Sequence, residues 1–126
     1  QHEIVLRRAK ITPTKTGQFV TLWKRDLEGV TCPFDGKDEI DYVMIITQTP
    51  VFSGVFIFPK AVLLTQGIFS IDRKSGKRGF RVYPSWDTAS NKQAQKTQSW
   101  QLDYFVDLNS EQVDIIRVER ILSINP

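Results

Sequence analysis

A nearly continuous apolar run, Asp41-Tyr42-Val43-Met44-Ile45-Ile46-Thr47, lies before the middle of the chain. An apolar run of this length is typical of a central strand that is buried on both faces of a sheet. Thr49-Pro50 then predicts a turn, and Gly54-Val55-Phe56-Ile57-Phe58 predicts a second strand that ends at Pro59. Neither run is long enough to span a bilayer. The sequence therefore predicts two adjacent strands in the middle of a sheet.

Further elements are expected on both sides of this pair. Turn residues at 12–17 join two β-rich segments and predict a hairpin between them. The last segment has helical spacing, although Val113-Asp114-Ile115 also alternates like a strand. The expected elements are strands at 3–8, 18–24 and 80–83, a short helix opening at 61–64, and helices at 89–105 and 110–123. These elements predict one domain, residues 1–126, of α/β or α+β class, with a mixed central β-sheet flanked by helices.

Composition excludes several kinds of site. The 126 residues are 40% hydrophobic and 25% charged, as in an ordinary globular domain. The single Cys32 rules out an intramolecular disulfide and a thiol-based zinc site, and the single His2 leaves almost nothing for a His-dependent triad. No charged-then-apolar leader is visible, so we expect a cytoplasmic protein without a membrane partner. Because the sequence starts without Met, we also expect part of the natural protein to lie upstream.

Charge is segregated along the chain. Residues 1–30 have a net charge of +3 and residues 73–101 one of +6, whereas residues 31–72 and 102–126 each have −3. Two basic segments around an acidic middle predict one positive face that would attract a polyanion. Lysines and arginines that merely solubilise the surface would produce the same totals, so charge alone leaves both interpretations open.

One candidate site combines a carboxylate with a lysine. Asp41 opens the first apolar strand and Lys60 follows the second, so adjacent strands could bring their side chains together. A carboxylate can hold Mg²⁺ and a lysine can orient the attacking water in phosphodiester cleavage. The position two residues before the lysine, where a second acid is usual, is Phe58. The alternative is a strand-end cap and a solvated lysine.

Two basic segments are candidates for nucleic-acid contacts. In the segment within residues 1–30, cations alternate with hydroxyls around a tight turn, and this pattern is suited to binding phosphate oxygens. In the second, Gln98 and Gln101 share a helix face that could bond base edges. The alternatives are a solvated hairpin and a polar helix face. The candidate contacts are Lys10, Thr12, Thr14, Lys15, Lys24, Arg25, Lys77, Arg78, Arg81, Trp86, Lys92, Lys96, Gln98 and Gln101.

Several of these motifs together resemble the MepB-like family of small bacterial proteins. The resemblance covers about residues 4–106 and rests on residues 9–25, Phe58-Pro59-Lys60, Gly76-Lys77-Arg78, Arg81-Val82-Tyr83-Pro84-x-Trp86-Asp87 and Lys96-Thr97-Gln98-x-Trp100-Gln101. It implies a restriction-endonuclease-like fold, in which Asp41 would be the strand acid that holds Mg²⁺ and Lys60 the catalytic lysine. Two features depart from the nuclease pattern: Phe58 stands in the acid position, and an upstream helix with acidic residues is missing from the sequence.

Three functions follow from these observations. The leading hypothesis is a nucleic-acid-binding protein, for DNA or RNA with DNA favoured, that contacts phosphates through a basic cleft. The second is a Mg²⁺-dependent phosphodiesterase centred on Asp41 and Lys60. The third is a regulator whose basic cleft accepts an anionic small molecule.

Overall fold

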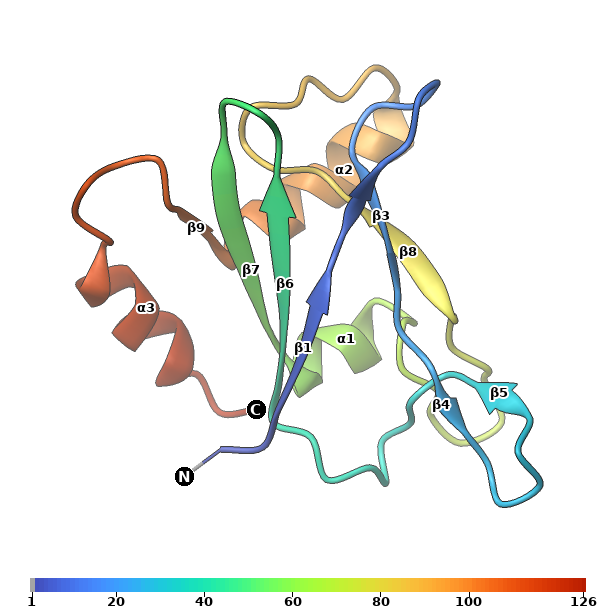
Figure 1. Ribbon diagram of the computed structural model, residues 1–126. Helices are drawn as coiled ribbons and strands as arrows, with labels where there is room; N and C mark the ends of the chain where they lie inside the picture. Colours follow the sequence, from blue (N-terminus) through green and yellow to red (C-terminus); the bar gives the residue numbers. More distant parts are fainter. Residues whose placement is uncertain (1) are drawn as a thin grey trace.

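Residues 2–126, which the computed structural model describes, form nine strands and three helices (Figure 1). The strands are β1 (Ile4–Arg8), β2 (Lys10–Ile11), β3 (Gln18–Thr21), β4 (Lys24–Arg25), β5 (Thr31–Cys32), β6 (Tyr42–Gln48), β7 (Ser53–Pro59), β8 (Gly79–Val82) and β9 (Phe105–Asp107). The helices are α1 (Lys60–Thr65), α2 (Lys92–Leu102) and α3 (Ile115–Leu122). The fold is mixed α+β, as the sequence predicts. No helix in this part of the chain is long and apolar enough to cross a membrane.

The central sheet has the strand order β1-β6-β7-β9. β6 and β7 are the two predicted apolar strands, and they pair antiparallel along their whole lengths, with Val43 opposite Phe58. β9 adds to β7 antiparallel, and β1 adds to β6 parallel, which makes the sheet mixed. The strands β2-β3-β8 form a second sheet, and β4 and β5 form a small third one.

Both faces of the central sheet are buried, as the apolar runs predict. On one face Val43, Phe56 and Phe58 belong to the larger core, which also contains residues of α1 and of the second sheet. On the other face Tyr42 and Ile57 pack beneath α3. Each of these side chains is at most 2% exposed. Full burial of an apolar side chain contributes roughly 1.5–3 kcal/mol, so this strand pair is a major source of stability.

The predicted hairpin between residues 3–8 and 18–24 is only partly correct. β1 pairs with β6 instead, and the chain then passes through the buried Ala9, whose N–H donates to the carbonyl of Ile46. Only the two residues of β2 form the hairpin with β3. A central strand needs hydrogen-bond partners on both edges, and β1 supplies those for β6.

The predicted helix 89–105 is too long at both ends. It begins after Asn91, whose side-chain oxygen accepts a hydrogen bond from the N–H of Ala94. It ends at Leu102, because Phe105 starts β9 and packs against Phe56 with ring centroids 4.7 Å apart. Likewise the helix predicted at 110–123 begins only at Ile115, after Asp114, whose side chain caps α3.

Candidate functional site

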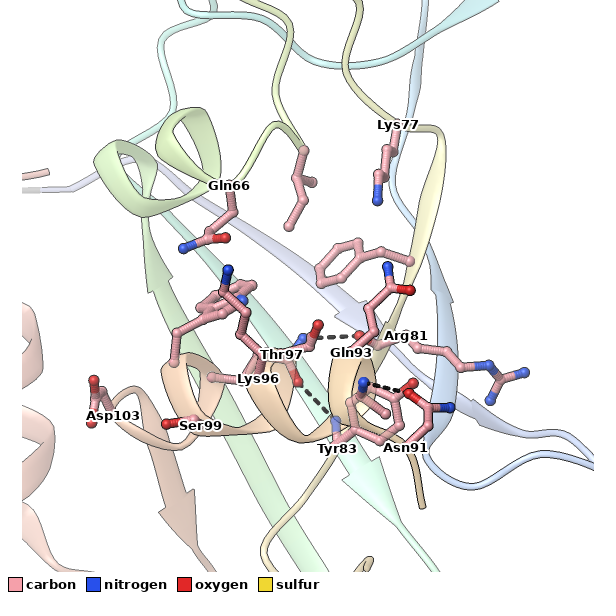
Figure 2. Close-up of a pocket in the computed structure, with 15 residues that line it drawn as sticks. Gln66, Lys77, Arg81, Tyr83, Asn91, Gln93, Lys96, Thr97, Ser99 and Asp103 are labelled. Carbon is pink, nitrogen blue, oxygen red and sulfur yellow. Dashed lines mark hydrogen bonds between the residues drawn. The ribbon is translucent and has the colours of Figure 1, made fainter. Parts of the chain in front are cut away.

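A cleft lies between α2, β8 and the segment that follows α1 (Figure 2). We call it the α2–β8 cleft; its lining residues come from segments 66–68, 77–83 and 91–103, and its volume is about 910 Å³. The cationic residues Lys77, Arg81 and Lys96 border it, against one carboxylate, Asp103. The ammonium groups of the two lysines are directed into the hollow, whereas the Arg81 guanidinium extends away from it, toward the early hairpin (Figure 2). The remaining polar lining consists of amides and hydroxyls. The cleft therefore has an excess of positive charge.

Lys77 and Lys96 provide the free cations of this cleft. Figure 2 shows their side chains directed into the same hollow, one from the segment before β8 and one from α2. Both residues are exposed, and within residues 2–126 neither ammonium group has an ion-pair or hydrogen-bond partner. Two uncompensated cations that converge on a hollow form a favourable site for an anion.

Arg81 connects the cleft to the early hairpin. Its guanidinium donates one hydrogen bond to Oγ1 of Thr12, at 2.7 Å, and one to the carbonyl oxygen of Thr16, at 3.2 Å. Next to this turn, Gly17 has φ +82° and lies against the ring of Tyr83, where a Cβ atom would come within 2.8 Å. The turn at 12–17 is therefore held at the edge of the cleft. It carries Thr14 and Lys15, both exposed, and Lys10 lies on the adjoining strand β2.

Gln101 links the two walls of the cleft, α2 and the β8 segment, through hydrogen bonds. Its side chain is completely buried; Oε1 accepts the N–H of Tyr83 and Nε2 donates to the carbonyl of Arg81, each at 2.8 Å. A buried amide would be costly without such partners. The amide of Gln98 similarly donates to the carbonyls of Asp87, at 2.8 Å, and Pro84, at 3.1 Å. These two predicted contact residues have a structural role, because their amides are already engaged.

Several other predicted contacts lie away from the cleft. Lys24 forms ion pairs with Asp35, at 3.1 Å, and Asp38, at 2.8 Å, and its hydrogen bond to Asp38 raises the pKa of its ammonium group. The Arg25 guanidinium lies over the ring of Trp23, 5.2 Å from its centroid. Both residues belong to β4, in the small sheet. The charge of Lys24 is therefore compensated within the protein.

The remaining three predicted contacts differ in their exposure and in the groups that they touch. Lys92 is exposed at the start of α2, one turn before Lys96. Arg78 is exposed, and it makes a long 3.4 Å hydrogen bond to the carbonyl of Thr31. The ring of Trp86 stacks on Phe52, with centroids 5.2 Å apart, and is partly buried. Of these three, only Lys92 extends the cationic edge of α2.

Asp41 and Lys60 meet through their backbones and not through their side chains. The N–H of Lys60 donates to the carbonyl of Asp41, at 2.9 Å, so the two strand ends do come together. The Asp41 carboxylate, however, accepts the N–H of Glu3 at 2.8 Å, and the Lys60 ammonium donates to the carbonyl of Asp38 at 2.5 Å. Phe58 is wholly buried in the core.

This arrangement does not fit a Mg²⁺ ion. Magnesium is held in proteins by carboxylates and other oxygen ligands in octahedral geometry. Nowhere in the described chain do three His, Cys, Asp or Glu side chains gather as a metal site would require. Asp41 would be left as a single protein carboxylate, so we derive no metal-dependent step here.

The family model for MepB-like proteins matches residues 1–107. The chain belongs to the MepB-like family. A solved structure, the crystal structure of MepB, is 40% identical and superposes with a TM-score of 0.84, covering 88% of this chain and 74% of that chain. Comparison with curated proteins finds no match. The predicted family resemblance is thus confirmed.

The α2–β8 cleft falls entirely within the part of the chain that matches the MepB-like model. Sequence reasoning missed some of its lining, namely Gln66, Asn91, Gln93 and Asp103. Gln93 could have been found, because it lies one helical turn before Thr97 on the cleft side of α2. Gln66 carries no such signal, since only the packing of α1 brings it to the cleft.

Proposed function

We propose that this MepB-like protein binds nucleic acid, with DNA favoured over RNA, through phosphate contacts in the α2–β8 cleft. The observation that carries the proposal is the convergence of two uncompensated ammonium groups, those of Lys77 and Lys96, on one hollow. Lysine and arginine contacts to phosphates supply most of the sequence-independent affinity of DNA-binding proteins. Such a cleft does not need a metal or a nucleophile to function.

The surroundings of the cleft support a polyanion more than a single anion. Lys92 extends the positive edge along α2, and Lys15 and Lys10 lie on the hairpin that Arg81 holds beside it. Arg81 has five N–H donors, of which two are used, so its guanidinium can add a phosphate contact on the hairpin side of β8, outside the hollow itself. Cations spaced along more than one element suit successive phosphates of a strand.

We further propose that the fold is restriction-endonuclease-like and that it serves binding here and not cleavage. A mixed sheet flanked by helices, with a basic cleft at its side, is compatible with that fold. Catalysis of the metal-dependent kind is poorly supported, because the side chains of Asp41 and Lys60 bond to other partners and not to each other, and Phe58 stands where a second acid is needed.

A second candidate function is the binding of an anionic small molecule. It is favoured by the volume of the cleft, about 910 Å³, which lies in the range of small-ligand pockets. The two functions differ in their dependence on ligand length. A polyanion site gains affinity with each further phosphate, whereas a metabolite site is saturated by a mononucleotide.

Fluorescence anisotropy with labelled DNA strands of increasing length, between about 50 and 200 mM salt, tests the proposal. We expect binding that strengthens with length and weakens steeply with salt. Lys77→Ala and Lys96→Ala should each reduce the slope of log K against log salt by about 0.7–0.9. The matched control is Arg120→Ala, which removes one exposed cation from α3, on the opposite face of the central sheet. Loss of affinity that is equal in all three variants, or a mononucleotide that competes as well as a strand, would overturn the proposal.

A further inference from the structure

The α2–β8 cleft has aromatic residues in its lining as well as cationic ones. Tyr83 and Trp100 line it, and both are partly buried. Each ring has a fixed position, because Tyr83 lies over Gly17 and Trp100 packs against Phe58 with centroids 5.4 Å apart. Rings held beside a cationic groove are the platforms on which unpaired bases stack.

The cleft also presents free amide groups. Gln66 and Gln93 are exposed, and within the described residues neither side-chain amide has a hydrogen-bond partner. Asn91 uses Oδ1 to accept the N–H of Ala94, at 2.8 Å, which leaves its NH₂ group available. Figure 2 shows Gln66 and Gln93 facing the hollow from different elements, the end of α1 and the start of α2. Side-chain amides are suited to the donor and acceptor edges of bases.

The aromatic rings and the free amide groups together are suited to an unpaired nucleotide and not to a base pair. In a duplex the Watson–Crick edges are paired and the base faces are stacked on their neighbours, so a hollow in a protein can contact only backbone and groove edges. An unpaired nucleotide presents a base face, a base edge and a phosphate at the same time. The cleft offers a partner for each of the three, and its volume of about 910 Å³ lies in the range of small-ligand pockets.

Building on the proposed function, we infer that the α2–β8 cleft binds an unpaired nucleotide of single-stranded DNA. The base stacks on the ring of Tyr83, and its edge meets the amides. The adjoining phosphates contact Lys77 and Lys96. The cleft is then selective for single strands, whereas phosphate contacts alone would accept duplex and single strand alike.

Three labelled DNA ligands of equal length test this selectivity: a single strand, the same strand in a duplex, and a strand that lacks its bases. We expect the single strand to bind about 5- to 150-fold more tightly than the abasic strand, the loss typical of base–aromatic stacking, and more tightly than the duplex. Equal affinity for all three with a steep salt dependence would overturn this inference and leave the proposed function standing. Absence of binding to any of them would overturn both.

A pair of variants at Tyr83 assigns the effect to the ring. Tyr83→Phe keeps the ring and Tyr83→Leu removes it, and neither changes the backbone hydrogen bonds that Tyr83 makes to Gln101 and Gln98. We expect Tyr83→Phe to keep the preference for the base-containing strand and Tyr83→Leu to lose most of it. A Tyr83→Leu protein with the wild-type preference would contradict the inference. Should that variant fail to fold, the abasic comparison with the wild-type protein still decides the question.

Discussion

Replacement of Gln101 by leucine tests how the cleft is held together. Leucine fills nearly the same volume, but it cannot accept the N–H of Tyr83 or donate to the carbonyl of Arg81. Both backbone groups would then lie against an apolar side chain between α2 and β8. The substitution therefore removes the polar link between the two cleft walls and leaves the helix itself intact.

The expected loss of stability follows from those two groups. A buried donor or acceptor left without a partner costs about 1–3 kcal/mol. The cost of two such groups is partly offset because leucine buries more apolar surface than glutamine. We therefore expect the free energy of unfolding to decrease by about 2–4 kcal/mol. That is a large part of the roughly 5–15 kcal/mol that stabilises a typical domain.

Urea denaturation followed by circular dichroism measures this decrease. Gln93→Leu is the matched control, because it makes the same change on an exposed position of the same helix. The control should shift the free energy of unfolding by no more than about 0.5 kcal/mol. If Gln101→Leu and Gln93→Leu lowered stability equally, the structural role assigned to the buried amide would be refuted.

Three further substitutions have expected outcomes in the same denaturation assay. Gly54→Ala should cost about 1–3 kcal/mol, because the added Cβ would come within 2.2 Å of the Phe105 ring; a neutral result would contradict that close approach. Asp114→Ala should cost about 1 kcal/mol, because the Asp114 carboxylate caps α3 by accepting the N–H of Arg117, at 3.0 Å; wild-type stability would argue against this cap. Burial raises the pKa of Asp87, so its ionised form destabilises the folded state above the ordinary pKa of 3.8. Asp87→Asn should therefore be more stable than wild type at neutral pH, with a difference that disappears below about pH 3.8; a difference that stayed constant with pH would exclude this cause.

Elements with a strong local pattern could be predicted from the sequence. β6 and β7 were predicted because their length and apolar composition suit a strand buried on both faces. The pairing of strands that lie far apart in the sequence could not be predicted. The parallel pairing of β1 with β6 depends on which edge of the sheet is left free, and nothing within residues 4–8 specifies it.

The same limit applies to the candidate site. Helical spacing placed Gln98 and Gln101 on one face of α2, but the pattern does not say whether that face meets solvent or the backbone of another element. Lys24 and its partner Asp38 are 14 positions apart, so their ion pair forms only when the β4 segment folds against the acidic loop. Lys77 and Lys96 were named from the sequence, and folding brings them to one cleft.

The location of the binding surface is tested most directly by a nuclear magnetic resonance titration of the labelled protein with single-stranded DNA. We expect the backbone amide signals of residues 77–83 and 91–103 to shift together and saturably, while those of α3, across the central sheet, stay in place. Shifts concentrated on α3, with an unaffected α2, would contradict the assignment of the α2–β8 cleft as the nucleic-acid site.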